Sequence, residues 1–199
     1  MKNIAVITDR FLPITQTFIY REITAIKNFN IIVLTRKKQN EELFPYESVY
    51  SFNNSSTVIY DFLRVIRRKK IKLIHIHFGV KALQYLQLKK ISRLPFVISF
   101  HGYDASKILK NPAILSKYKK MLFPNADLII TVSQKLKDNL VNAGCPKDKM
   151  TVLWSGVNTE QFYYIARTLQ NNQTVKVLSI ARLTEKKGFP ILYDLLQMS

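Results

Sequence analysis

Two histidines, His77 and His101, each follow a short apolar segment that is rich in isoleucine, valine and phenylalanine. A neutral imidazole donates one hydrogen bond and accepts another near pH 7, so a histidine in such a place can orient a substrate hydroxyl or transfer a proton. The structural alternative is a histidine that closes a loop through its own hydrogen bonds. The third histidine, His75, alternates with His77 along one segment, and we expect it to pack under a helix.

A basic turn near the carboxyl end of the sequence suits a different chemistry, the stabilisation of a departing phosphate. Arg182 and Lys187 are five positions apart, and Gly188 and a helical pattern follow them. Arg182 offers a planar guanidinium that matches phosphate oxygens, and Lys187 offers a mobile point charge. Both stabilise a leaving group more strongly as its negative charge grows. The structural alternative is a solvated basic turn.

The elements that must position these side chains alternate between strand and helix. Short apolar runs predict strands over residues 3–8, 30–34, 73–77, 95–100, 127–132 and 150–154. Apolar residues at helical spacing predict helices over 17–28, 57–69, 80–90, 113–123 and 133–143. The alternation predicts an α/β fold with a doubly wound, mainly parallel sheet. Such sheets bind ligands at the carboxyl ends of their strands.

Several polar residues and glycines fall in the loops at those carboxyl ends, and we take them as candidate substrate-binding residues. The first loop contributes Thr15 and Thr17, which can bond an acceptor hydroxyl or cap the helix that follows. The other candidates are His77, Gly102, Asp104, Ser133, Gly156 and Asn158. Asp104 can instead hold its own loop or pair with a lysine, and Ser133 suits a helix N-cap.

A polar stretch rich in asparagine and glutamine predicts a linker between two domains. We expect a Rossmann-like domain over residues 1–165, a linker over 166–174, and the opening of a second domain over 175–199, with a strand at 175–180. One strand and one helix cannot bury a core of their own, so we expect a truncated second domain. Residues 36–56 are polar and aromatic and predict a loop with one short strand near 49–52.

The charge balance is strongly basic, because 31 Lys and Arg residues against 13 Asp and Glu residues give a formal net charge of +18. This favours an anionic partner such as nucleic acid, a phosphorylated substrate or an anionic membrane surface. No zinc-finger spacing, heptad run or RNP-like motif accompanies the charge, so we expect no nucleic-acid partner. No apolar run approaches the roughly 20 residues of a membrane-spanning helix, and no signal-peptide pattern is present, so we expect a cytoplasmic protein.

Together these segments resemble the GT-B retaining glycosyltransferases of family 4. The resemblance rests on residues 13–18 (PITQTF), 74–78 (IHIHF), 99–104 (SFHGYD), 127–133 (DLIITVS) and 156–158 (GVN) followed by Phe162. These motifs resemble the amino-terminal, acceptor-side domain of the family, and residues 179–189 resemble the start of its nucleotide-sugar domain. Ala181 stands where the family has glycine, and the first loop lacks the paired glycines of many relatives.

The resemblance implies a transferase of polysaccharide biosynthesis that moves a sugar from a nucleotide-sugar donor to a glycan or lipid-linked acceptor, with retention. His101 would orient the transferred sugar and the attacking hydroxyl, while Arg182 and Lys187 would stabilise the leaving phosphate. The resemblance implies no cofactor and no metal ion, since the donor is itself a substrate. A lipid-linked acceptor would bring a helix that presents lysines between Lys107 and Lys120 to an anionic membrane surface.

The family also carries two glutamates seven residues apart that contact the sugar and the ribose, and this sequence ends before that motif. We therefore expect the isolated chain to bind an acceptor and to have little or no transferase activity. A first alternative is a non-catalytic acceptor-binding subunit that works with a separate donor-binding chain. A second alternative is a basic nucleotide-binding or nucleic-acid-binding module, which only the charge and the doubly wound pattern favour.

Overall fold

The computed structural model describes residues 1–199 apart from 14–15, 55, 167, 169–177, 182 and 198–199. Its contacts divide the chain into two compact units, Met1–Gly156 and Val157–Ser199, and each is described by itself. Most of the predicted linker and the first half of the predicted strand over 175–180 lie outside the described residues. The boundaries at residues 165 and 174 therefore stay predictions.

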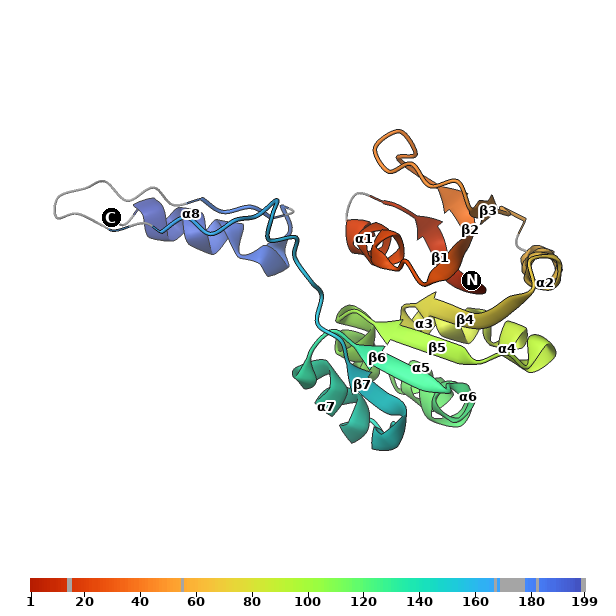
Figure 1. Cartoon of the computed structure of the whole chain (residues 1–199). Helices are drawn as coiled ribbons and strands as arrows, with labels where there is room; N and C mark the ends of the chain where they lie inside the picture. Colours follow the sequence, from red (N-terminus) through yellow and green to blue (C-terminus); the bar gives the residue numbers. More distant parts are fainter. Residues whose placement is uncertain (14–15, 55, 167, 169–177, 182, 198–199) are drawn as a thin grey trace. The chain divides into compact units, whose positions relative to one another are not determined.

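Seven strands form one sheet in the larger unit, in the order β3-β2-β1-β4-β5-β6-β7 (Figure 1). Each pair of neighbours is parallel, which confirms the expected doubly wound α/β sheet. The strand order reverses between β1 and β4, and ligands of such sheets bind at this switch point. The strands are β1 (Lys2–Phe11), β2 (Phe29–Lys38), β3 (Val49–Ser51), β4 (Ile71–His77), β5 (Phe96–Phe100), β6 (Leu128–Thr131) and β7 (Met150–Val152).

Helices cover the two faces of the sheet unequally. On one face, α1 (Thr17–Ala25) packs Ile19 and Ile23 into a core with Val6 and Val33. The other helices of this unit pack on the opposite face, in a larger core around Phe62. They are α2 (Val58–Arg68), α3 (Gly79–Gln84), α4 (Leu86–Ser92), α5 (Pro112–Lys117), α6 (Phe123–Asn125) and α7 (Gln134–Asn142).

The alternation of side chains along β4 and β5 decides what faces α1. Ile74 and Ile76 belong to the larger core, so His75 and His77 point to the opposite face, toward α1. The same alternation on β5 turns Ser99 to that face. The prediction that His75 packs under a helix is confirmed, because it is buried opposite a side chain of α1.

The predicted helix over 80–90 is wrong as a single element, because the backbone leaves the helical conformation at Tyr85 (φ −99°, ψ 12°). The helix α3 ends before this residue and α4 begins after it. The buried Tyr85 ring lies 5.5 Å from the ring of Phe62 on α2. The change of backbone conformation between α3 and α4 thus coincides with a packing contact to α2.

The predicted helix over 113–123 is likewise divided. It contains α5, a π-helical turn over Tyr118–Leu122 and then α6. The wider turn is the place where the Tyr118 ring enters the core, with its centroid 5.8 Å from that of Phe100. The helical spacing was correct, but periodicity alone does not reveal a local change of winding.

The first two strands are longer than predicted, since β1 reaches Phe11 and β2 reaches Lys38. Their extra residues pair with one another, with Arg10 beside Lys37 and Phe11 beside Lys38. The short strand predicted near 49–52 is confirmed as β3. Because most residues at these strand ends are polar or basic, the apolar runs predicted shorter strands.

The smaller unit contains a 3-10 turn over Glu185–Lys187 and the helix α8 (Phe189–Gln197). Gly188 joins them with a φ of 71°, a left-handed conformation that favours glycine. Residues 178–180 lie in no strand, unlike the prediction. Over the described part of the whole chain, no helix is long and apolar enough to cross a bilayer.

Gly79 begins α3 at a point where the backbone almost touches the larger core. A Cβ atom built on Gly79 would lie 2.2 Å from Cε1 of Phe100 and 2.8 Å from the hydroxyl oxygen of Tyr118. Both of these rings are fully buried. Neither ring can move aside without disturbing the packing around it, so only glycine fits here.

We expect Gly79→Ala to destabilise the protein by about 1–3 kcal/mol, the range found when a methyl group is forced into a packed core. Urea denaturation followed by circular dichroism measures this loss. Gly156→Ala is the matched control, because no atom lies within 4 Å of a Cβ built there, and its unfolding midpoint should stay close to that of the wild type. Equal midpoints for the two variants would contradict the close contact at Gly79.

Candidate functional site at the carboxyl edge of the sheet

His77 and His101 lie side by side at the carboxyl edge of the sheet, where β4 and β5 end. The Nδ1 atom of His77 is 2.9 Å from Nε2 of His101, and the two rings are stacked with centroids 5.1 Å apart. One ring donates this hydrogen bond and the other accepts it. His77 is fully buried and His101 is half-buried, so His101 is the member of the pair that a ligand can reach.

Aromatic rings surround the exposed member of the pair. The ring of Phe18 on α1 lies 4.6 Å from the ring of His101, and the ring of Phe78 lies 4.9 Å from it. Burial lowers the pKa of His101 to about 4, because the charged imidazolium loses solvation among these groups. His101 is therefore neutral near pH 7 and acts there through hydrogen bonds.

Asp104 fixes the loop that carries His101. Its carboxylate accepts a hydrogen bond from the backbone N–H of Gly79 at 2.9 Å and another from the backbone N–H of His101 at 3.0 Å. Asp104 is only 3% exposed, and no ion pair found among the described residues includes it. Of the alternatives for this residue, the loop-holding role is thus the one that the structure supports. Gly102 makes the turn possible with a φ of 123°.

A carboxylate from α1, Glu22, faces the histidines and was not among the predicted residues. Its Oε1 atom lies 3.6 Å from Nδ1 of His75 and 4.0 Å from Nε2 of His77. On the other side of the His75 ring, Nε2 lies 2.8 Å from the hydroxyl oxygen of Ser99. Burial raises the pKa of Glu22 to about 7. A carboxylate, three imidazoles and a hydroxyl are thus gathered beneath α1.

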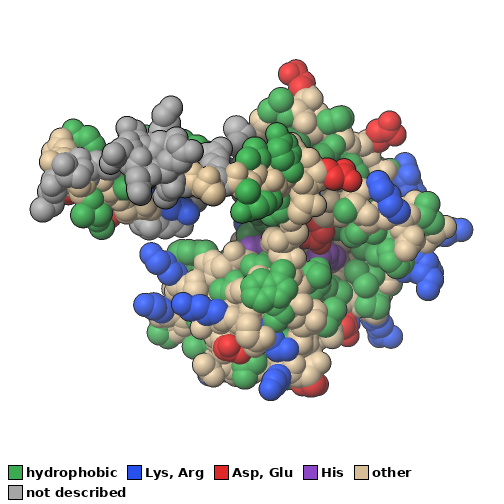
Figure 2. All heavy atoms as spheres, turned by 60° about the vertical axis from the view of Figure 1, so that its left-hand side comes forward, with side chains coloured by type: hydrophobic (Ala, Val, Ile, Leu, Met, Phe, Trp, Pro, Cys, Tyr) green, Lys and Arg blue, Asp and Glu red, His purple; other side chains and the backbone are tan. Residues whose placement is uncertain are grey.

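The helical pattern of the sequence could have identified Glu22 as a residue that faces the sheet. It is adjacent to Ile23 and three residues after Ile19, and both isoleucines point to the sheet. An acidic residue on the inward face of an amphipathic helix needs a partner at its buried end. Figure 2 shows histidine side chains at the floor of a hollow in the molecular surface, with an acidic side chain at its wall.

The candidate residues of the first loop and those after β6 and β7 do not join the histidine cluster among the described residues. Thr15 lies outside the described residues, and Thr17 is the first residue of α1 rather than its cap, which is Gln16. Ser133 is confirmed as the N-cap of α7, because its hydroxyl accepts a hydrogen bond from the N–H of Leu136 at 3.4 Å. Gly156 is exposed at the end of the larger unit.

The remaining candidates belong to the smaller unit. The side chain of Asn158 accepts hydrogen bonds from the N–H groups of Glu160 and Gln161, so it caps its own turn. Lys187 is exposed on the 3-10 turn that precedes α8. Arg182 lies outside the described residues.

Comparison with known proteins gives one family and several relatives. Residues 27–161 match the model of Glycosyltransferase Family 4. The chain is 32% identical over 127 residues to the amylovoran biosynthesis glycosyltransferase AmsK of Erwinia amylovora, which is 62% of this chain and 30% of AmsK. The chain therefore spans about 30% of the length of that curated relative.

Solved structures share the fold at low sequence identity. Anabaena Alr3699/HepE in complex with UDP superimposes with a TM-score of 0.65 and 15% identity, over 81% of this chain and 46% of HepE. The lipopolysaccharide outer core galactosyltransferase WaaB superimposes with a TM-score of 0.56 and 16% identity, over 78% of this chain and 46% of WaaB. Each comparison thus covers about half of a longer protein.

The buried histidines make stability depend on pH. Burial lowers the pKa of His75 and of His101 to about 4, and it lowers the pKa of His77 well below its usual value. Between about pH 6.5 and pH 4 the unfolded chain binds protons that the folded protein excludes, so stability falls on acidification. The raised pKa of Glu22 acts oppositely between about pH 7 and pH 4.5, because there the folded protein keeps a proton that the unfolded chain releases.

We expect the wild-type protein to lose stability between pH 6.5 and pH 5, with each excess proton worth about 1.4 kcal/mol per pH unit. Glu22→Gln removes the opposing group and should steepen the loss, while His101→Asn should make it shallower. Urea midpoints measured across this range test the order of the three slopes, and Glu41→Gln, an exposed acid elsewhere, should match the wild type. A protein that gains stability on acidification would contradict the neutral histidine cluster.

Proposed function

The chain belongs to Glycosyltransferase Family 4, and from that premise we propose that its larger unit is the acceptor-side half of a retaining transferase. The donor would be a nucleotide-sugar, and the acceptor a glycan or lipid-linked glycan of a bacterial polysaccharide pathway. The name of AmsK, a glycosyltransferase of amylovoran biosynthesis, supports the acceptor class. The UDP in the HepE structure supports a nucleoside diphosphate as the leaving group.

The position of His101 is the observation that carries the proposal. It lies at the carboxyl edge beside the switch point, its loop is fixed by Asp104, and its Nε2 atom is bonded to His77. None of the hydrogen bonds found among the described residues uses its Nδ1 atom, which is therefore available to a sugar hydroxyl. With a pKa of about 4, His101 is a weak base at pH 7. Its proposed role is to orient the sugar and the acceptor hydroxyl rather than to remove a proton.

The smaller unit would supply the beginning of the donor site. Lys187 is exposed just before the N-terminus of α8, where backbone N–H groups favour an anion. We propose that Lys187 and Arg182 stabilise the diphosphate as it leaves, and that no metal ion takes part in this step. Because the two-glutamate motif of the family is not in this sequence, we propose that the chain by itself binds acceptor and has little transferase activity.

Binding of a glycan near His101 tests the acceptor role. In ¹⁵N-labelled protein, oligosaccharide fragments of a bacterial exopolysaccharide should shift the amide signals of His101, Gly102 and Phe78. His101→Ala should weaken this binding by up to about tenfold, the equivalent of one lost hydrogen bond. Asn142→Ala, at the exposed end of α7, is the control and should bind as the wild type does. Sugar transfer from a UDP-sugar by the chain alone, or glycan binding that is indifferent to His101, would contradict the proposal.

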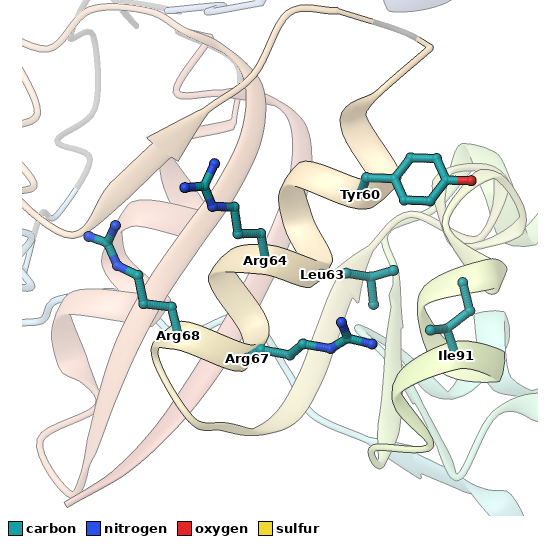
Figure 3. Close-up of a pocket in the computed structure, with 6 residues that line it drawn as sticks. All are labelled: Tyr60, Leu63, Arg64, Arg67, Arg68 and Ile91. Carbon is teal, nitrogen blue, oxygen red and sulfur yellow. The ribbon is translucent and has the colours of Figure 1, made fainter.

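We also propose that the transferase docks on the anionic cytoplasmic face of a membrane, and two exposed basic sets support this. The first lines an open groove of about 480 Å³ formed by Tyr60, Leu63, Arg64, Arg67, Arg68 and Ile91 (Figure 3). Arg67 extends toward Ile91, whereas Arg64 and Arg68 point away from it. Because Tyr60 and Ile91 are 72% and 50% exposed, the groove combines cations with apolar side chains, as membrane-binding surfaces do.

The second set consists of the lysines that were expected to lie on one helix. The structure instead distributes them over a 3-10 turn (Lys107–Lys110), α5 and the π-helical turn, with a break at Asn111. Asn111 caps α5 through hydrogen bonds from the N–H groups of Ala113 and Ile114, which explains the break. The exposed lysines are Lys107, Lys110, Lys117, Lys119 and Lys120.

Sedimentation with liposomes tests the membrane proposal. The chain should bind vesicles that contain anionic lipid, and raising the salt from 0.05 to 0.5 M should release it, because the Debye length falls well below about 10 Å. The two salt concentrations are roughly threefold below and threefold above the physiological ionic strength of about 0.15 M. Replacing Arg64, Arg67 and Arg68 by glutamine should weaken binding more than the same change at Lys27, Lys135 and Lys147, which are exposed elsewhere. Binding that ignores salt and anionic lipid would refute docking by charge.

A further inference from the structure

We propose that Glu22, His75 and His77 form a binding site for a divalent cation of the zinc class, which joins α1 to the end of β4. Each residue offers one ligand atom, and these three atoms all lie within 4.8 Å of one another. They are Oε1 of Glu22, Nδ1 of His75 and Nε2 of His77. The site is distinct from the proposed donor site, where the leaving phosphate was expected to need no metal ion.

The spacing of the three atoms suits a cation better than it suits direct hydrogen bonds. The carboxylate oxygen is 3.6 Å from one nitrogen and 4.0 Å from the other, beyond the range of a hydrogen bond. Ligand atoms bound to one Zn²⁺ at about 2.1 Å in tetrahedral geometry lie roughly 3.4 Å apart. The two oxygen–nitrogen distances exceed that spacing by about 0.2 and 0.6 Å, and all three atoms lie within 4.8 Å of one another, so small side-chain movements close the site around a cation.

His77 provides an independent indication. Its side chain is 0% exposed, and its Nε2 atom has no hydrogen-bond partner. A buried ring nitrogen without a partner costs free energy, and this one points to the Glu22 carboxylate. A proton on Glu22 satisfies one of the two nitrogens that face it, whereas a cation satisfies both nitrogens and the carboxylate together.

Each histidine is also held by its other ring nitrogen, as metal-bound histidines generally are. His75 uses Nε2 for the contact with Ser99, and His77 uses Nδ1 for the contact with His101. These partners orient the free lone pairs toward Glu22. Burial keeps both rings neutral near pH 7, which is the form that binds metals.

The donor set selects the kind of cation. Two imidazoles and one carboxylate are the ligands of many zinc sites, whereas Mg²⁺ and Ca²⁺ prefer oxygen ligands alone. The Glu22 side chain is 30% exposed, so a cation can enter from solvent past it. The site spans two elements, because α1 contributes the carboxylate and β4 contributes both imidazoles.

Equilibrium dialysis of the purified chain, without an affinity tag and after treatment with EDTA, tests the site. The wild type should bind one equivalent of Zn²⁺, and its melting temperature should rise with Zn²⁺ and not with Mg²⁺. Glu22→Gln keeps the size of the side chain but removes a charged ligand. It should weaken zinc binding by more than the roughly 10- to 100-fold that is typical when a metal ligand loses its own hydrogen-bond partner. Ser99→Ala, which removes such a partner of His75, should fall in that lower range.

Glu41→Gln is the matched control, since Glu41 is an exposed acid paired with Lys38, and it should bind zinc as the wild type does. Circular dichroism of each variant without metal establishes that it is folded. The proposal is overturned if the folded wild type binds no stoichiometric zinc, or if Glu22→Gln binds it as tightly as the wild type does. Neither readout depends on sugar transfer or glycan binding, so a failure here is separate from a failure of the proposed function.

Discussion

A single buried carboxylate, that of Asp104, determines the geometry of the candidate site. It accepts the backbone N–H of Gly79 after β4 and the backbone N–H of His101 after β5. Hydrogen bonds to a charged acceptor contribute roughly 1.5–3 kcal/mol each, and the two bonds together join the loop after β4 to the loop after β5. The contact between His77 and His101 depends on these two bonds. One bonded N–H belongs to His101 itself, and the other belongs to Gly79, two residues after His77.

Burial disfavours the charged form of the three histidines, and the neutral form suits the role proposed for His101. A chain with a formal net charge of +18 gains nothing from three more positive charges, and desolvation keeps all three imidazoles neutral near pH 7. Neutral rings can both donate and accept, which is what a hydroxyl-rich sugar requires of its partners. The exposed cations of the two basic sets, such as Arg64, Arg67 and Lys107, lie instead on helix surfaces and turns, where water and anionic partners can reach them.

The sequence predicted those parts of the structure that depend on local pattern. Apolar runs located the main strands, and the strand-end positions of His77 and His101 were enough to place them at one edge. The division of a predicted helix at Tyr85 and the π-helical turn at Tyr118 could not be predicted, because they result from packing between distant elements. Glu22 was missed for a related reason: its neighbours in space come from a strand about 50 residues away, and only its place on the apolar face of α1 hinted at them.

His77 couples the proposed cation site to the proposed sugar site through the position of one proton. A cation on its Nε2 atom leaves the ring proton on Nδ1, which then donates to Nε2 of His101. Because His101 is neutral, its own proton must then lie on Nδ1. His101 would therefore offer a donor to the sugar when the cation is bound, whereas without the cation either ring can be the donor. A metal ion buried beneath α1 can in this way set the hydrogen-bonding character of a residue that it does not touch.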